Sequence, residues 1–270
     1  MKIKMIAVDM DGTFLNDKKK YNVSRFNKLF KQLQEKEIAF VVASGNQYFQ
    51  LRTFFPRNYK NITFISENGA NILIGDQPFY NAELPKNIVM HTLNILDKLE
   101  PINLIVCGKK SAYILEDATV EQISNAKFYY PRIKVVKSWN ELLNENDTFF
   151  KFALSFDPSE MTEKLTMLQI TLKGSLIPVS SGHGDIDLII LGVNKYTGLK
   201  LLGKKWHISD SEIATFGDSG NDLEMLKHTK YSFAMENAQE QIKKAANSII
   251  GSNNSEALLD TIESIINGNN

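Results

Sequence analysis

Short runs of apolar, often β-branched residues, each followed by a polar side chain, are the feature that most limits how this 270-residue chain can fold. Three of them, KMIAVD, IAFVVAS and EIATFGD, end at Asp9, Ser44 and Asp218, and a fourth, IDLIILGVNK, reaches Lys195 just beyond its end. Runs that are apolar at nearly every position suit strands buried on both faces, as in a parallel sheet. Because helical patterns lie between them, the sequence predicts a doubly wound, Rossmann-like α/β core.

The polar residues at the ends of these runs are expected to meet. In an open α/β sheet the carboxyl ends of parallel strands lie along one edge, and ligands bind in the crevice that forms there. Asp9, Ser44, Asp218 and Lys195 are therefore predicted to converge on one site at that edge.

The middle of the chain, residues 83–187, follows a different pattern. Helical and strand-like segments alternate here too, but no strand ends on a group suited to catalysis. Turn-rich segments at its two ends, NAELP and SSGHGD, are suitable hinges. We expect a smaller α/β domain inserted into a discontinuous core domain of residues 1–82 and 188–270.

The charge balance narrows the range of partners. The 31 Lys and Arg residues equal the 31 Asp and Glu residues, which disfavours bulk electrostatic capture of nucleic acid or of an anionic membrane. The single cysteine, Cys107, excludes an internal disulfide and suits a reducing compartment. No apolar run approaches the roughly 18 residues of a membrane helix. We expect a soluble cytoplasmic protein with a small-molecule substrate, and we infer no protein partner.

The stretch DMDGT places two carboxylates, Asp9 and Asp11, two residues apart after a buried strand. A plain Asp-Gly turn is the alternative interpretation. A carboxylate such as Asp9 can attack phosphorus and form an aspartyl-phosphate, which divides a slow hydrolysis into two steps. Asp11 can protonate the departing alkoxide and then take a proton from water. Gly12 permits the sharp turn that lets both carboxylates reach one phosphate.

Opposed carboxylates and a phosphate dianion require a cation. Asp218, in the stretch GDSGND, is the natural third ligand beside Asp9 and the main-chain carbonyl of Asp11. Mg²⁺ suits such an oxygen-rich set, because it sits between carboxylates and phosphate. Asp222 is expected just behind these ligands, where it acts through water or orients Lys195.

In their order along the chain, DMDGT, VVASGN, Lys195 and GDSGND resemble the four motifs of the haloacid dehalogenase-like hydrolases. The long insertion between the second and third motifs resembles the class IIB cap of the Cof-type sugar-phosphate phosphatases. The resemblance implies a Mg²⁺-dependent sugar phosphatase with Asp9 as nucleophile and Asp11 as general acid and base. The phosphate contacts are expected to be Met10, Ser44, Gly45, Lys195 and Asn221.

Some features leave room for other interpretations. Ser44 taken alone suits an N-cap as well as a phosphate contact. Asn46 departs from the resemblance, since many Cof-type relatives carry Arg there, and this leaves open the charge-based contacts with the substrate but not the chemistry. His183 and the ENG segment at residues 67–69 are expected near the mouth between cap and core. The alternatives to a phosphatase are a sugar phosphomutase of the same superfamily and a phosphoryl-accepting regulator, which the Asp-x-Asp spacing disfavours.

Overall fold

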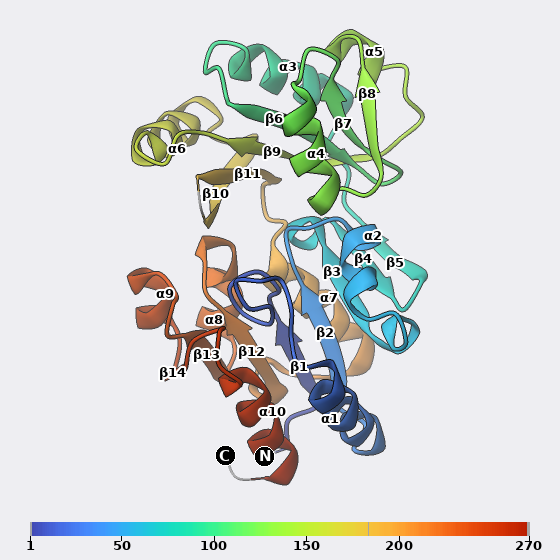
Figure 1. Cartoon of the computed structure of the whole chain (residues 1–270), viewed down its shortest axis with the longest axis vertical. Coiled ribbons are helices and arrows are strands. Elements are labelled where there is room, and N and C mark those ends of the chain that lie inside the picture. Colours follow the sequence, from blue (N-terminus) through green and yellow to red (C-terminus); the bar gives the residue numbers. More distant parts are fainter. Residues whose placement is uncertain (1, 183, 269–270) are drawn as a thin grey trace.

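The computed structural model describes residues 2–182 and 184–268, in which the chain forms two β-sheets with separate sets of helices (Figure 1). The larger sheet has eight strands in the order β14-β13-β12-β1-β2-β3-β4-β5. Its strands are parallel from β14 to β3, and β4 and β5 add an antiparallel edge. The strands are β1 (Met5–Val8), β2 (Ala39–Ala43), β3 (Thr63–Ser66), β4 (Asn71–Ile74), β5 (Gln77–Asn81), β12 (Ile213–Gly217), β13 (Tyr231–Met235) and β14 (Ser248–Ile250).

The larger sheet is doubly wound about β1. From β1 the chain proceeds through β2 to β3 on one side, whereas β12, β13 and β14 follow one another on the other side. Every residue of β1 and β12 is buried, as their apolar sequences predict. The helices packed with this sheet are α1 (Val23–Glu35), α2 (Tyr48–Leu51), α7 (Lys195–Trp206), α8 (Leu223–His228), α9 (Glu240–Ala245) and α10 (Ala257–Asn267). The predicted α/β core is therefore confirmed, and its switch point, where ligands bind in such sheets, is the end of β1.

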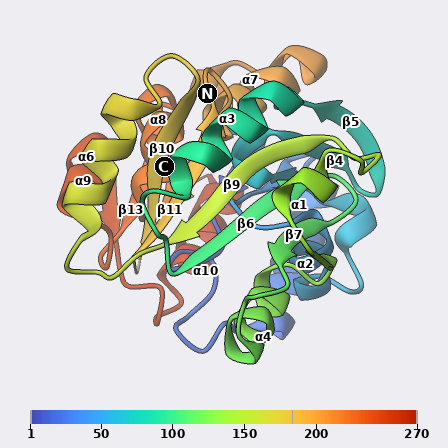
Figure 2. The ribbon, with the colours of Figure 1, turned by 90° about the horizontal axis from the view of Figure 1, so that it is seen from above.

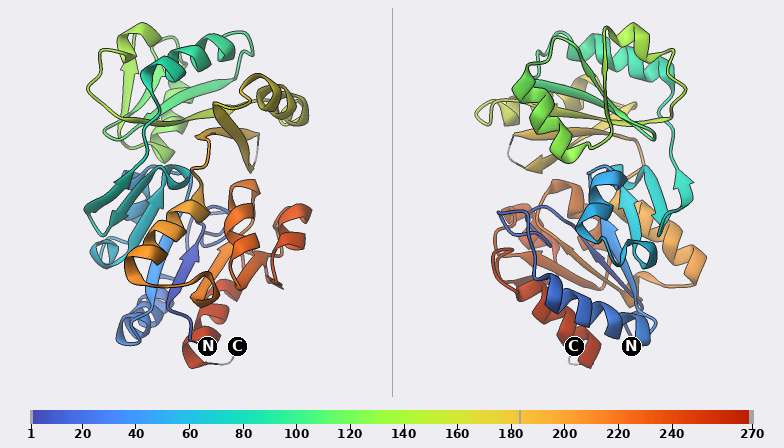
Figure 3. Two further views of the ribbon diagram at one scale, coloured as in Figure 1. Left: turned by 180° about the vertical axis from the view of Figure 1, so that it is seen from behind. Right: turned by 45° about the vertical axis from the view of Figure 1, so that its right-hand side comes forward.

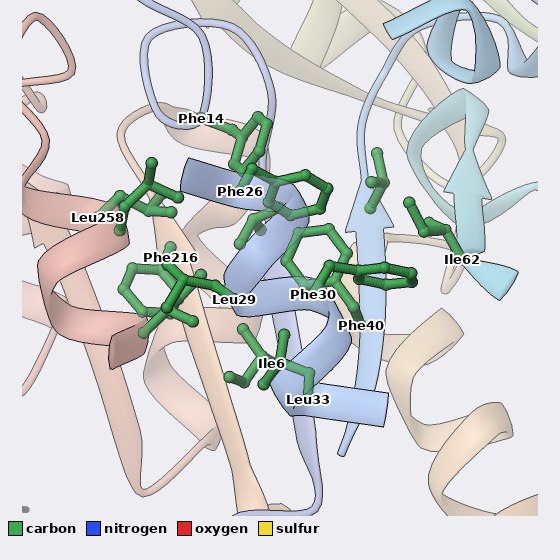
Figure 4. Close-up of a cluster of buried hydrophobic side chains, with 14 of the residues drawn as sticks. Ile6, Phe14, Phe26, Leu29, Phe30, Leu33, Phe40, Ile62, Phe216 and Leu258 are labelled. Carbon is green, nitrogen blue, oxygen red and sulfur yellow. The ribbon is translucent and has the colours of Figure 1, made fainter. Parts of the chain in front are cut away.

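The two faces of the larger sheet are buried by different helices. Helices α1 and α10 cover one face, and α7, α8 and α9 cover the other. Figure 4 shows the first of these layers, in which Phe26 and Phe30 of α1 face the sheet. Phe14, in the loop after β1, lies edge-on to Phe26 with ring centroids 5.3 Å apart. This aromatic packing anchors the loop that carries the two aspartates of the DMDGT motif.

The smaller sheet has six strands in the order β10-β11-β9-β6-β7-β8, antiparallel except for the pair β7 and β8. Figure 2 shows it from above, with α3 beside β9. Its strands are β6 (Asn103–Gly108), β7 (Ala112–Leu115), β8 (Ile133–Val136), β9 (Phe149–Ser155), β10 (Leu176–Gly182) and β11 (Asp185–Ile190), and its helices are α3 (Lys86–Leu96), α4 (Val120–Tyr129), α5 (Trp139–Leu142) and α6 (Met161–Thr171). Cys107 is buried in β6. None of the helices described in the structure is long and apolar enough to span a membrane.

Two chain segments join the sheets (Figure 3): one between β5 and α3, the other between β11 and α7. The expected boundary between residues 187 and 188 falls inside β11, which continues in the smaller sheet to Ile190. We propose that residues 83–190 form the inserted domain, here called the cap, and that the core resumes after Ile190.

The fourth apolar run was expected to be a strand of the core sheet, and that expectation is wrong. The run forms β11 of the smaller sheet, where it pairs antiparallel with β9 and β10. Lys195 is instead the first residue of α7, whose N-cap is Asn194. An apolar run indicates that a strand is buried but not which strands it pairs with. Its pattern therefore could not distinguish the two sheets.

Candidate active site

Three of the predicted residues lie side by side because their strands are neighbours. Asp9 follows β1, Ser44 follows β2 and Asp218 follows β12, and β1 pairs in parallel with both β2 and β12. Asp9 and Ser44 are buried, with 5% and 2% of their surfaces exposed. The structure thus brings these side chains together at the carboxyl edge of the larger sheet, where it faces the smaller sheet (Figure 1).

Lys195 reaches the same point from the start of α7. Its side chain is fully buried, and its Nζ donates to Asp9 Oδ1 at 2.5 Å and to Asp222 Oδ1 at 2.7 Å. Burial alone would lower the pKa of Lys195, but Asp222 and Asp9 outweigh it and raise that pKa. The ammonium group is therefore held charged between two carboxylates.

Asp222 is occupied by its own neighbours. Its Oδ1 accepts from Lys195, and its Oδ2 accepts from the main-chain N–H groups of Asp218 and Ser219 at 2.9 and 3.1 Å. These bonds hold the loop after β12 in place and orient the lysine. With both oxygens engaged in this way, Asp222 stays predicted to act behind the groups that would contact a metal ion.

The acidic cluster has more negative charge than its lysine can balance. Asp9, Asp218 and Asp222 offer carboxylate oxygens that lie within 4.8 Å of one another. Burial, followed by the charge of Asp222, raises the pKa of Asp218 to about 7. Burial also raises the pKa of Asp9 well above its usual value, although Lys195 opposes this. Three carboxylates beside one ammonium form a set of hard oxygen donors that suits a divalent cation.

Gly12 lets the DMDGT loop pass close to this cluster. Its φ is +74°, and a Cβ added there would lie 2.5 Å from Asp218 Oδ2. Any side chain at this position would meet both backbone strain and a collision with the carboxylate. Thr13 follows and donates from its hydroxyl to Asp218 Oδ1 at 2.8 Å. The loop therefore contributes to positioning Asp218 as well as Asp9.

Asp11 points into more open surroundings, with 30% of its side chain exposed. Its Oδ1 accepts from Lys19 Nζ at 2.5 Å and its Oδ2 from Asn46 Nδ2 at 2.7 Å. Asn46, the residue that departs from the family pattern, thus contacts the expected general acid. Lys19, which sequence reasoning missed, supplies a positive charge there. It lies in an ordinary Lys-rich turn that carries no distinctive signal.

The remaining predicted phosphate contacts lie around the same point, with differing geometry. The Ser44 hydroxyl accepts from the Asn46 N–H at 3.1 Å, and Asn221 Oδ1 accepts from Lys195 Nζ at 3.3 Å. The side chain of Met10 is fully buried in the hydrophobic core, so only its main chain can face a phosphate. The helix expected after Gly45 is short, because α2 covers only Tyr48–Leu51 before a 3₁₀ turn.

Asp9, Asp11, Ser44, Gly45, Asn46 and Asn221 line the floor of a cavity of about 640 Å³ between the two sheets. Its opposite wall includes Tyr129 at the end of α4, Lys151 of β9 and Asp187 of β11. Sequence reasoning did not select the last two, although a charged residue in each of two apolar strands, KFALSF and IDLII, was a usable signal. The expectation for His183 falls outside the described residues. In the ENG segment, Asn68 is buried and contacts both Asp187 and Asn221.

Comparison with known proteins gives a consistent result. A family model described as haloacid dehalogenase-like hydrolase matches residues 6–262. The chain is 42% identical over 266 residues, covering 98% of it and 97% of the relative, to the Escherichia coli 5-amino-6-(5-phospho-D-ribitylamino)uracil phosphatase YbjI. It is 27% identical to phosphatase YwpJ of Bacillus subtilis, covering 92% of the chain and 94% of the relative.

Among solved structures, SMU.1108c from Streptococcus mutans is 34% identical with a TM-score of 0.93, covering 98% of this chain and all of that one. A haloacid dehalogenase-like hydrolase from B. subtilis, at 24% identity and a TM-score of 0.84, covers 97% of this chain and 99% of its own and shares the fold. With a family match over nearly its whole length and relatives that are named phosphatases, the chain belongs to the haloacid dehalogenase-like hydrolases and is a phosphatase of that family.

Proposed function

We propose that this protein is a Mg²⁺-dependent phosphatase that hydrolyses phosphomonoesters of small metabolites, sugar phosphates foremost, through an aspartyl-phosphate on Asp9. The observation that carries the proposal is the convergence of Asp9, Asp218, Asp222 and Lys195 at the carboxyl edge of the larger sheet, where Asp9 also lines the cavity. A surplus of carboxylates around a single ammonium is what a site for a divalent cation and a phosphate dianion requires.

The first chemical step takes place on Asp9. A carboxylate oxygen of Asp9 attacks phosphorus, the bond from phosphorus to the ester oxygen breaks, and Asp11 gives its proton to the departing alkoxide. Lys195 holds Asp9 Oδ1 at 2.5 Å, which orients the nucleophile and favours its ionised form against the effect of burial. In the second step water attacks the aspartyl-phosphate, Asp11 takes the proton from that water, and inorganic phosphate leaves.

Asp9, Asp218 and the main-chain carbonyl of Asp11 would hold Mg²⁺. When bound, the ion neutralises the charge that gathers between the carboxylates and the transferring phosphoryl group. Asp222 holds the loop after β12 through its bonds to the N–H groups of Asp218 and Ser219. Asp222 therefore positions the metal ligand Asp218 and does not itself bind the ion.

The other phosphate contacts are assigned by position. The Ser44 hydroxyl and the Gly45 N–H stand at the end of β2, beside Asp9, and both residues line the cavity. The Asn221 amide lies within hydrogen-bond distance of Lys195. Neutral donors together with one ammonium can bind the three peripheral phosphate oxygens while Asp9 attacks.

The cavity suits a small, hydroxyl-rich leaving group. Its volume of about 640 Å³ lies within the usual range for small-molecule sites. Cap residues with polar side chains, among them Asn125, Ser155 and Asp185, line it opposite the catalytic groups. The name of the E. coli relative describes a phosphorylated ribityl chain, which is a polyol phosphate. We therefore extend the proposed substrates from sugar phosphates to polyol phosphates of this kind.

The test is phosphate release from a panel of sugar and polyol phosphates, 5-amino-6-(5-phospho-D-ribitylamino)uracil and p-nitrophenyl phosphate, with Mg²⁺ and with EDTA. Wild type, Asp9→Asn and Asp11→Asn are compared with Asp76→Asn, which changes an exposed carboxylate in the turn between β4 and β5. We expect multiple turnover that needs Mg²⁺, disappears in Asp9→Asn and persists in Asp76→Asn.

Other outcomes would replace the proposal. Isomerised sugar phosphates without net phosphate release would show a mutase, in which the aspartyl-phosphate returns its phosphoryl group to the sugar. A stable phosphoprotein without turnover would show a phosphoryl-accepting regulator. Turnover that survives in Asp9→Asn would refute the assignment of the nucleophile.

A further inference from the structure

Asn68 joins the cap to the catalytic cluster through one side chain. It lies in the 3₁₀ turn η3 (Glu67–Gly69), between β3 and β4, and only 1% of its surface is exposed. Its Nδ2 donates to Asp187 Oδ2 on β11 of the cap at 2.5 Å, and its Oδ1 accepts from Asn221 Nδ2 at 3.1 Å. Asn221 Oδ1 in turn accepts from Lys195 Nζ and from the Ser219 hydroxyl.

The two ends of this chain of contacts determine which way each amide points. An ionised carboxylate such as Asp187 can only accept hydrogen bonds, so the NH₂ group of Asn68 has to face it. An ammonium such as Lys195 can only donate, so the oxygen of Asn221 has to face the lysine. Between them, the oxygen of Asn68 meets the NH₂ group of Asn221. Every contact thus pairs a donor with an acceptor, and rotating either amide by half a turn would break two of them.

Asp187 is itself held firmly. It is buried, and its Oδ1 forms an ion pair with Lys151 Nζ of β9 at 2.7 Å. Both residues belong to the cap, so the carboxylate and its counter-ion move together with that domain. A buried, paired charge of this kind is costly to separate from its partner.

The contact also lies against the expected phosphate site. A Cβ added to Gly45 would lie 2.9 Å from Asp187 Oδ2 and 3.2 Å from Asn68 Oδ1. The cap carboxylate and the Asn68 amide therefore pack directly on the glycine whose N–H is proposed to bind phosphate. Asn68 has a positive φ of +55°, a conformation that asparagine tolerates better than most residues.

We propose that Asn68 is a positioning residue that makes the phosphate site depend on the seating of the cap. With Asp187 in place, the Asn68 oxygen holds one hydrogen of the Asn221 amide and directs the second toward the substrate phosphate. Without Asp187, the Asn68 amide turns freely and Asn221 loses its orientation. This inference rests on the proposed function, because it assigns Asn221 and Lys195 to phosphate binding.

The experiment exchanges the two polar groups. Asn68→Asp keeps an oxygen that accepts from Asn221, but it places a second carboxylate directly against the carboxylate of Asp187. Asp187→Asn replaces the carboxylate, which can only accept a hydrogen bond from Asn68, with an amide that can donate or accept. The double variant restores one carboxylate and one amide in reversed order and keeps the net buried charge unchanged, with a neutral amide oxygen in place of the carboxylate that faces Lys151. Asn71→Asp is the matched control, because Asn71 is buried nearby and its side chain, within the described part of the chain, bonds only to Ser66 and Asn81 in the larger sheet.

Two readouts are taken with Mg²⁺ present: kcat and KM with p-nitrophenyl phosphate, and binding of inorganic phosphate by calorimetric titration. We expect each single variant to lower kcat/KM by roughly ten- to a hundredfold, the usual effect of removing a group that orients a direct contact. Phosphate affinity should fall in parallel. The double variant should recover most of both losses, and urea unfolding should show that all variants are folded under assay conditions.

Two results would overturn the inference. One is a double variant no better than the product of the two single losses, because independent sites behave in that way. The other is an Asn68→Asp enzyme that matches Asn71→Asp. If Asn68→Asp does not fold, Asp187→Asn and phosphate titration test the same bond from the cap side. A wild type that binds phosphate but releases none from any ester would refute the proposed function, while the titrations would still decide on Asn68.

Discussion

Glu67→Gln should stabilise the protein at alkaline pH and leave its stability nearly unchanged at acidic pH. Only 2% of the surface of Glu67 is exposed, and among residues 2–182 and 184–268 neither carboxylate oxygen has a nitrogen or oxygen hydrogen-bond partner, although the Cys107 thiol lies close enough to lower its pKa slightly. Lys151 Nζ lies 3.9 Å away but is closer to Asp187, at 2.7 Å. Burial raises the pKa of Glu67 from 4.5 to about 8, although Lys151 opposes this.

The sign follows from which state binds the proton. Below pH 4.5 Glu67 is protonated in both the folded and the unfolded chain, so its contribution to stability is complete. Between pH 4.5 and about 8 only the folded chain keeps the proton, and stability is lost as the pH rises. One pKa unit corresponds to about 1.4 kcal/mol, which sets a ceiling of roughly 5 kcal/mol on the loss. Glutamine has the same shape and no charge to bury, so the variant avoids this loss.

The assay is urea unfolding followed by the fluorescence of Trp139 and Trp206, from about pH 5 to about pH 9. The wild type should lose stability relative to Glu67→Gln as the pH rises through this range. Glu35→Gln is the control, because Glu35 is 61% exposed and its pairing with Lys31 at 3.7 Å contributes little. A difference between wild type and Glu67→Gln that stays constant with pH would refute the reasoning.

Three further predictions concern the acidic cluster. Lys195→Met should lower the free energy of unfolding by about 3–5 kcal/mol, because it leaves two buried carboxylates without their ammonium; an unchanged urea midpoint would contradict this. Gly12→Ala should abolish turnover while the protein stays folded by circular dichroism, since its Cβ would displace Asp218; activity near the wild-type level would show that the loop adapts. Mg²⁺ affinity, measured by calorimetry, should fall as the pH drops through about 7, because a proton on Asp218 competes with the ion. In Asp218→Asn the Mg²⁺ affinity should be weak at every pH. If this variant shows the same affinity and pH dependence as the wild type, Asp218 is not a ligand of the metal.

The positions of the strand-borne groups could be predicted because local sequence carries them. Asp9, Ser44 and Asp218 each follow a continuous apolar run, and such runs form adjacent parallel strands whose carboxyl ends share an edge. The DMDGT turn needs only the glycine that its positive φ demands. The geometry of the parallel sheet therefore brings these groups together independently of the cap.

Lys195 shows where such rules stop. Its place in the site agrees with the expectation, but the strand assigned to carry it belongs to the cap sheet. Ile186 and Leu188 of the run IDLIILGVNK are buried in the cap, and burial gives the same signal in either sheet. The pairing of β11 with β9 and β10 involves residues far apart in the chain, and periodicity does not record it.

By itself the sequence determined the α/β core, the aspartates at its carboxyl edge and the family of the protein. Only the tertiary structure decided which cap residues meet that edge. Lys151 and Asp187 are single charges in apolar strands, and what they do depends on Asn68, which lies far from both in sequence and within hydrogen-bond distance of Asp187 in space. The physical reason is that strand and turn formation depend on near neighbours in the chain, whereas the contact between two domains depends on how their surfaces meet after each has folded.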